Sequence, residues 1–131
     1  MTKEGYTSNE RIKEESDFLR GNISDLLHDG SITHFPSEEE FLLKFHGITQ
    51  QDNRDERLIR KKNGQERNWL FMLRLRLPGG RMTPSQWLAA ETLSDQFGNG
   101  TLKLTTRQAI QIHGVVKQDL KQTMKLSLIH I

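Results

Sequence analysis

Alternating apolar and polar residues mark two β-strands in the second half of the chain. From Trp69 to Leu77 the odd positions are Trp, Phe or Leu, while Arg74 and Arg76 occupy even positions. The segment 101–114, TLKLTTRQAIQIHG, alternates in the same way, with Leu and Ile on one side and polar residues on the other. Successive side chains of a strand point to opposite faces, so each strand should have one apolar and one polar face.

Helical spacing of apolar residues predicts helices around these strands. Thr83 as N-cap and Pro84 at the first helical position begin the clearest one. Its predicted buried stripe is Trp87, Leu88, Ala90, Leu93 and Phe97. Further helices are predicted from Ser8 to Gly21, over 24–28 and over 117–128.

The remaining segments give weaker patterns. We expect a loop over 31–40, a short strand over 41–47, and a solvated loop or exposed helix over the polar run 48–68. The order strand, strand, helix, strand, helix predicts an α+β fold whose helices cover the apolar sheet face. A helix between strands 69–77 and 101–114 favours a parallel pair, with both polar faces on the uncovered side.

Composition narrows the possible functions. The chain has 131 residues, enough for one small domain, and its 19 basic and 17 acidic residues leave a net charge of +2. Such a small excess gives no argument for nucleic acid or an acidic membrane surface. The absence of cysteine excludes disulfides, thiol nucleophiles and cysteine-held zinc or iron–sulfur sites within this chain. No signal peptide or membrane span is apparent, so we expect a soluble, cytoplasmic protein.

The two polar strand faces carry the candidate chemistry. Neither strand contains Asp or Glu, although together they hold Arg74, Arg76, Lys103 and Arg107. Cations gathered without carboxylates repel one another unless they meet anions, and arginine suits carboxylate, phosphate or sulfur oxyanions. Thr105, Gln111 and His113 add groups that could orient a bound anion by hydrogen bonds. A polar sheet face that merely faces water is the alternative.

Four stretches resemble the sulfite reductase hemoproteins of the nitrite/sulfite reductase family, in their NADPH-linked branch. They are ERIKEESDFLRG (10–21), KFHGITQQDNRD (44–55), FMLRLRLPGG (71–80) and GNGTLKLTTRQAIQIHG (98–114). The resemblance implies a ferredoxin-like half-domain over 41–131, preceded by a helical N-terminal extension over 1–40. It also implies that this chain corresponds to the N-terminal part of the β-component and is truncated at its C-terminus, where KLSLIHI departs from the expected polar helix.

The resemblance also implies a cofactor, a reaction and partners. Family members reduce sulfite to sulfide with six electrons at a siroheme coupled to a [4Fe–4S] cluster, in sulfate assimilation and cysteine biosynthesis. A flavoprotein α-component supplies the electrons from NADPH. Carried over residue by residue, Arg74 and Arg107 would be catalytic and contact sulfite. The siroheme contacts would be Lys103, Thr105, Arg107, Gln111 and His113, with Gln50, Gln51 and Arg54 as weaker candidates.

Two further consequences and three alternatives follow. Because this chain lacks the cluster cysteines, we expect it to be inactive alone and to hold no metal by itself. Three other identities of the chain stay open. The first is a fragment of a ferredoxin-dependent sulfite or nitrite reductase, and the second is a non-catalytic anion- or tetrapyrrole-binding module. The third is a structural domain whose basic face contacts a partner protein.

Overall fold

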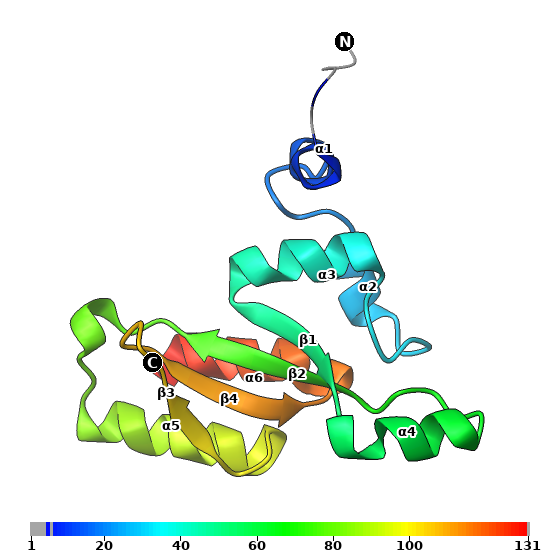
Figure 1. The fold of residues 1–131 in the computed structure, drawn as a ribbon. Coiled ribbons are helices and arrows are strands. Elements are labelled where there is room, and N and C mark those ends of the chain that lie inside the picture. The colour runs from blue at the N-terminus through cyan, green and yellow to red at the C-terminus, as the bar shows by residue number, and fades with distance from the viewer. Residues whose placement is uncertain (1–4, 6, 131) are drawn as a thin grey trace.

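A four-stranded antiparallel sheet runs through the computed structural model, which describes residues 5 and 7–130 (Figure 1). The strands lie in the order β1 (Ile48–Asp52), β2 (Trp69–Leu75), β4 (Ile110–Val115), β3 (Leu102–Leu104). The helices are α1 (Ser8–Glu14), α2 (Ile23–His28), α3 (Ser37–Leu43), α4 (Arg54–Lys62), α5 (Pro84–Phe97) and α6 (Lys117–His130). Short 3-10 helices are η1 (Lys44–His46) and η2 (Pro78–Gly80). The predicted α+β class is confirmed.

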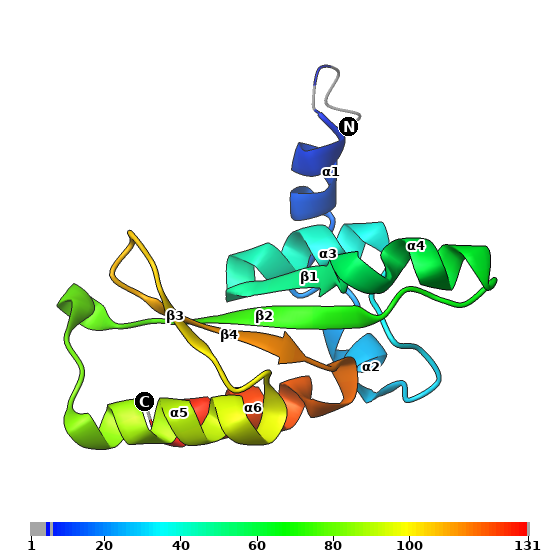
Figure 2. The same cartoon turned by 60° about the horizontal axis from the view of Figure 1, so that its bottom comes forward.

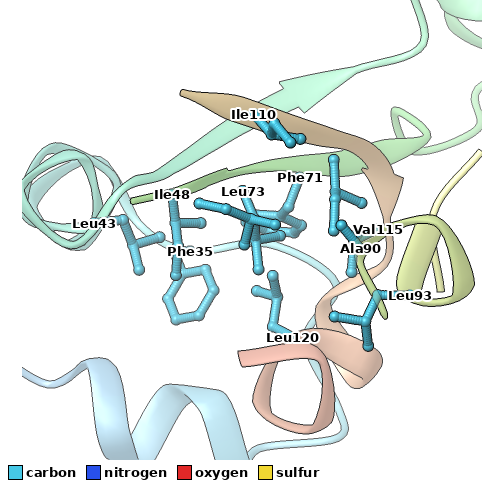
Figure 3. Close-up of a cluster of buried hydrophobic side chains, with 12 residues drawn as sticks. Phe35, Leu43, Ile48, Phe71, Leu73, Ala90, Leu93, Ile110, Val115 and Leu120 are labelled. Carbon is cyan, nitrogen blue, oxygen red and sulfur yellow. The ribbon is translucent and has the colours of Figure 1, made fainter. Parts of the chain in front are cut away.

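One face of the sheet is covered by helices. Figure 2 shows α5 and α6 side by side beneath the sheet, with α2 next to α6. The core between these layers contains Phe71, Ile110 and Val115, which are completely buried (Figure 3). Ile112 belongs to the same core and is also completely buried. Removing this apolar surface from water is the main force that holds the helices on the sheet.

Helix α5 begins as predicted but buries a narrower stripe. Thr83 Oγ1 accepts a hydrogen bond from the Gln86 amide at 3.2 Å, and Gln86 Oε1 accepts one from the Thr83 amide. These reciprocal bonds form a capping box. The stripe prediction is wrong for Trp87 and Leu88, which are 40% and 60% exposed. Leu88 precedes the buried Ala90 by two residues, which places it about 200° around the helix.

Three predictions in the N-terminal half are wrong. Helix α1 ends at Glu14 and does not reach Gly21, and α3 begins at Ser37 within the predicted loop. The predicted strand 41–47 is the end of α3 followed by η1. A short apolar run such as Phe-Leu-Leu fits a strand or a buried helix equally well, so its periodicity is ambiguous. Gly47, in the left-handed conformation (φ 77°), ends the helical segment, and β1 follows it.

The polar run 48–68 combines a strand and an exposed helix. Its first five residues form β1, and α4 follows with Asn53 as N-cap. No residue of α4 is buried, and the helix extends past the end of the sheet (Figures 1 and 2). An exposed helix was therefore the correct expectation for part of this segment. The predicted short helix at 24–28 is also present, as α2.

The segment 101–114 is a hairpin and not the single strand predicted. Strands β3 and β4 are antiparallel, joined by a turn with Gln108 at φ 58°. The predicted parallel pairing is wrong too, because β4 returns antiparallel to β2. The polar residues of β3 and β4 nevertheless lie on the same face of the sheet. Cross-strand partners share a face, and Leu102 pairs with Ile112 while Lys103 pairs with Gln111.

A β-bulge near Gly114 keeps β4 in contact with the core on both sides of the bulge. Pairing shifts from Leu73 with Ile112 to Phe71 with Val115, so the β4 side contains one extra residue. Gly114 has φ 80°, and a Cβ there would lie 2.9 Å from Asn99 Cβ. Only glycine fits this conformation and this space. The bulge returns Val115 to the core.

Helix α6 covers the predicted range 117–128. Leu120 is buried and Met124 packs against the core, as the spacing predicted. The side chain of Leu128 and the terminal Ile131 lie outside the described residues, and so does part of the atypical C-terminal sequence. Among the described helices, none has the length and apolar character needed to cross a membrane.

Candidate functional site

Three predicted site residues form one row across the uncovered face of the sheet. Arg74 of β2 pairs with Gln111 of β4, and Gln111 pairs with Lys103 of β3. Cross-strand neighbours on one face have Cβ atoms roughly 5 Å apart, so these side chains act as one surface. The sheet pairing therefore brings together two cations and an amide that are separated by up to 37 positions in the sequence.

His113 lies beside this row and is held by it. Its Nε2 donates a hydrogen bond to Gln111 Oε1 at 3.0 Å, which leaves the Gln111 amide NH₂ available to a ligand. Burial lowers the pKa of His113, and the positive charge of Lys103 lowers it further. Since the ordinary pKa is 6.5, this imidazole is neutral near pH 7 and carries its hydrogen on Nε2. His113 is thus a hydrogen-bond donor rather than a cation.

Thr105 and Arg107 lie in the turn of the β3–β4 hairpin, not on a strand. The Thr105 hydroxyl oxygen accepts hydrogen bonds from the backbone amides of Arg107 and Ala109, each at 3.3 Å. The Thr105 amide donates to Ala109 O at 3.0 Å. Thr105 therefore shapes the turn, while Arg107 stays exposed on it. In Figure 2 the hairpin turn stands on the side of the sheet opposite α5 and α6.

A groove of about 640 Å³ brings Arg74, Arg76 and Arg107 together. Its other wall comes from η1 and Gly47, and includes Lys44 and His46. The backbone joins the two walls, because the Arg74 amide donates to Gly47 O at 2.8 Å. None of the residues lining this groove is acidic. Lys103, Gln111 and His113 belong to the adjoining row on β3 and β4.

The cations of this face have no anionic partner within the described part of the chain. The ion pairs of the described chain involve residues away from this face, mainly on α1 and α4. Arg74 is half-buried, and its Nε is a buried donor without a hydrogen-bond partner among the described residues. An unsatisfied buried donor costs about 1–3 kcal/mol, and more when it is charged. A bound anion would remove this cost and the mutual repulsion of the arginines.

The weaker candidates fare differently. The side chain of Gln50 points into the core, where its amide bonds both the amide and the carbonyl of Phe35, at 2.6 and 3.2 Å. Gln50 is 7% exposed, and both its amide oxygen and its amide nitrogen are bonded to Phe35. Gln51 is exposed on the opposite side of β1, and Arg54 is exposed at the start of α4. Neither of these two lines the groove.

Sequence reasoning missed the Lys44 and His46 side of the groove. Both residues fell in the segment predicted to be a strand. The signal that could have found them is Gly47, because a glycine directly after basic residues is typical of a helix end. A helix ending there would have placed Lys44 and His46 at the start of β1, beside the arginine strand.

Comparisons with known proteins identify the family of this chain. Residues 63–127 match the family model of the nitrite/sulfite reductase ferredoxin-like half domain. The sulfite reductase [NADPH] subunit beta of Saccharomyces cerevisiae is 58% identical over 121 residues, which is 90% of this chain and 8% of that protein. The chain belongs to the nitrite/sulfite reductase family.

A bacterial relative and a solved structure extend this result. The sulfite reductase [NADPH] hemoprotein beta-component of Bacillus subtilis is 47% identical over 116 residues, covering 88% of this chain and 20% of that protein. The NirA protein of Mycobacterium tuberculosis has the same fold, with a TM-score of 0.72 at 15% identity over 95% of this chain and 24% of NirA. This nitrite/sulfite reductase chain thus spans about a fifth or less of the curated relatives named here.

The donor set fits the family's siroheme. This tetrapyrrole carries eight carboxylates, and the open face offers cations, an amide and a neutral imidazole with no competing acid in the groove. Within the described part of the chain, Arg74 Nε is a donor without an acceptor. The iron–sulfur cluster is a different case, since the sequence has no cysteine. The described residues also contain no group of three or more His, Asp or Glu side chains able to hold a metal.

Proposed function

We propose that the open face of the sheet forms one wall of the siroheme and sulfite site of a sulfite reductase. The single observation that carries this is the cluster of Arg74, Arg76 and Arg107 in a groove without carboxylates, in a chain of this family. Because the chain spans only a small part of its relatives, the activity of the complete proteins is part of the proposal. We expect this chain to be inactive by itself.

Each side chain has a defined part in this proposal. Lys103, Gln111 and His113 would bind the ring carboxylates, with His113 acting as a neutral Nε2–H donor and Thr105 shaping the turn. Arg74 and Arg107 would bind the sulfite oxygens, and Arg107 would also meet the ring edge. Bound siroheme would supply the electrons that reduce sulfur. Arginine stays charged at all working pH values, so it stabilises negative charge and leaves proton donation to water.

The reaction sets what the arginines must do. Reduction of sulfite to sulfide uses six electrons and six protons, and breaks three S–O bonds with the release of three waters. Negative charge gathers on each oxygen before it is protonated, and fixed guanidinium groups stabilise it in advance. We further propose that electrons come from NADPH through a flavoprotein partner, in the cytoplasm. The relatives from Saccharomyces cerevisiae and Bacillus subtilis are named as beta subunits or components of a sulfite reductase [NADPH], which supports such a partner.

The proposal includes a domain division. Residues 41–131 would form the ferredoxin-like half-domain, and residues 1–40 a helical extension. The family model supports the core of the first unit, since it matches residues 63–127.

Siroheme titration of the full chain tests the proposed site. Visible absorption should change on binding, and Arg74→Met should weaken the affinity about 10- to 100-fold, the effect of losing a charged hydrogen bond worth about 1.5–3 kcal/mol. Arg81→Met is the matched control, because Arg81 is exposed and does not line the groove. A wild-type chain without a spectral change would count against siroheme binding by this wall alone, and an Arg74→Met chain that binds like the control would contradict the part given to Arg74.

Turnover in a complete relative tests the catalytic part separately. The arginine equivalent to Arg74 would be replaced in the Bacillus subtilis enzyme, and sulfite reduction measured after siroheme loading is matched. We expect turnover to fall by at least 10-fold. Unchanged turnover at matched loading would limit Arg74 to cofactor binding.

A further inference from the structure

The turn of the β3–β4 hairpin has a glutamine at a position that favours glycine. Residues 106–108 link Thr105 to Ala109, and the Gln108 amide donates to Thr105 O at 3.1 Å. Gln108 ends this three-residue loop in the left-handed conformation, at φ 58°. Loops of this length use that conformation at their last residue, and glycine adopts it without the steric cost of a Cβ. Another residue keeps it only where the surrounding structure imposes it.

The side chain of Gln108 packs on Gly80 of η2. Figures 1 and 2 show the hairpin turn at the same end of the sheet as the segment between β2 and α5, which contains η2. A Cβ added to Gly80 would lie 2.9 Å from Gln108 Cβ and 3.1 Å from Gln108 Oε1. Gly80 also has φ 68°, so its conformation and its surroundings both require glycine. Because the backbone sets the position of Gln108 Cβ, side-chain rotation cannot relieve this contact.

The contact between Gln108 and Gly80 lies next to the exposed cation of the turn. Arg107 directly precedes Gln108 and lines the groove together with Arg74 and Arg76. Hydrogen bonds to Thr105 shape the turn from within, whereas the contact with Gly80 joins the turn to η2. Since η2 continues the chain just beyond Arg76, this contact fixes where Arg107 stands relative to the arginine strand.

We infer that Gln108 is a positioning residue of the groove, whose contact with Gly80 holds Arg107 beside the other two arginines. Like charges repel, so an exposed arginine on a free turn moves away from its neighbours. A turn that is fixed before the ligand arrives also avoids the entropy cost of ordering Arg107 on binding. The ligand class is an oxyanion or carboxylate, and its identity as sulfite or siroheme rests on the proposed function.

Gly80→Ala tests the contact without any ligand, because it forces the hairpin turn away from η2. In NMR spectra of the full chain, the amide signals of Thr105, Arg107 and Ala109 should shift. The order parameter of the Arg107 amide should fall from about 0.85 to below about 0.6. Gly64→Ala is the control, since Gly64 has φ 67° and a Cβ there would meet no atom within 4 Å. Wild-type turn signals and order parameter in Gly80→Ala would overturn the inference.

Gln108→Gly separates positioning from stability. This variant removes the side chain that packs on Gly80, and glycine suits the left-handed backbone at this position. The thermal midpoint should therefore not fall below that of the wild type. Siroheme affinity, measured by visible absorption, should fall about three- to tenfold, as part of a charged hydrogen bond is lost. A lower midpoint with unchanged affinity would overturn the inference and leave Gln108 with a structural role only.

A double-mutant cycle tests whether Gln108 acts through Arg107. The siroheme titration is repeated for Arg107→Met and for the double variant that also carries Gln108→Gly. If Gln108 acts by placing Arg107, Gln108→Gly should cause less than about a twofold further loss once the arginine is absent. An equal loss in both backgrounds would mean that Gln108 acts on the ligand independently of Arg107, and the positioning role would be wrong.

The outcomes also separate this inference from the proposed function. Siroheme binding that Arg74→Met and Arg107→Met weaken but Gln108→Gly leaves unchanged supports the proposed function and overturns only the role of Gln108. A wild-type chain without a spectral change counts against siroheme binding by this wall. In that case the NMR comparison of Gly80→Ala with Gly64→Ala decides the positioning role by itself, because it needs no ligand.

Discussion

The two faces of the sheet differ in how their side chains are buried and hydrogen-bonded. On the helix-covered face, Leu73, Ile110 and Ile112 are at most 3% exposed and packed among other apolar side chains. On the open face, the residues between them in sequence are Arg74 and Gln111, which leave hydrogen-bonding groups unused. Residues that are adjacent in the chain therefore serve separate purposes. The covered face supplies stability, and we propose that the unused groups of the open face bind a ligand.

This separation follows from the pleat of the strands. A side chain on one face of a sheet is shielded from changes on the other by the backbone layer between them. Residues of the open face can thus carry an energetic cost without loosening the core directly, as Arg74 does with an Nε that has no hydrogen-bond partner among the described residues. Stability lost on the open face has to be offset by packing on the covered face.

The largest expected effect compares two neighbouring residues of β4. Ile112→Ala should lower the free energy of unfolding by about 2–5 kcal/mol, since Ile112 is completely buried and its loss leaves a cavity. Gln111→Ala should lower it by less than about 1 kcal/mol, yet weaken siroheme binding. Urea unfolding and siroheme titration measure the two quantities. Equal losses of stability in the two variants would show that the faces are not independent.

A smaller effect is expected at the point where the two walls of the groove meet. Gly47 has φ 77°, and a Cβ there would lie 3.2 Å from the carbonyl oxygen of Arg74. Gly47→Ala should destabilise the chain by about 1–3 kcal/mol through backbone strain, and it should also shift Arg74 and weaken sulfite binding.

Gly64→Ala is the matched control for Gly47→Ala. Gly64 has φ 67°, but a Cβ there would meet no atom within 4 Å. This variant should show comparable strain with unchanged sulfite affinity in calorimetric titration. If both variants weaken binding equally, the effect comes from general destabilisation and not from the contact with Arg74.

Periodicity predicted the C-terminal half of the fold well because its elements are long and each has one buried face. Strand β2 and helix α5 match their predicted ranges within two residues. The hairpin was mistaken for one strand because its partners pair odd with odd and even with even, so the alternation continues through the turn. The polar face was therefore predicted correctly from an incorrect strand.

The N-terminal half could not be predicted in the same way. Its helices are at most seven residues long before β1, too short for a clear period. Residues 17–19 all have positive φ values, but none of them is glycine, so the sequence does not indicate this left-handed turn. Counting charges separately in the two regions of the chain would have shown that the basic residues are concentrated after residue 43. Residues 1–43 contain four basic and ten acidic residues, whereas residues 44–131 contain fifteen basic and seven acidic, and the net +2 hides this segregation.

The smallest expected effect concerns the electrostatic link between Lys103 and His113 on the open face. Burial and Lys103 hold the pKa of His113 below 6.5, so in the folded chain the ring resists protonation. The unfolded chain binds that proton first as the pH falls. The contribution of His113 to stability is therefore complete above pH 6.5 and is lost as the pH falls from there through the lowered pKa.

Lys103→Met should bring the pKa of His113 closer to 6.5, because one of the two causes of the shift is removed. An NMR titration of the imidazole measures this pKa, and thermal midpoints between pH 5 and 8 should become less dependent on pH in the variant. Lys61→Met on the exposed helix α4 is the control and should change neither quantity. If the pKa of His113 is the same in Lys103→Met as in the wild type, burial alone sets this pKa. The charged and polar groups of the open face would then be electrostatically independent. A carboxylate that neutralises Lys103 would in that case leave the protonation of His113 unchanged.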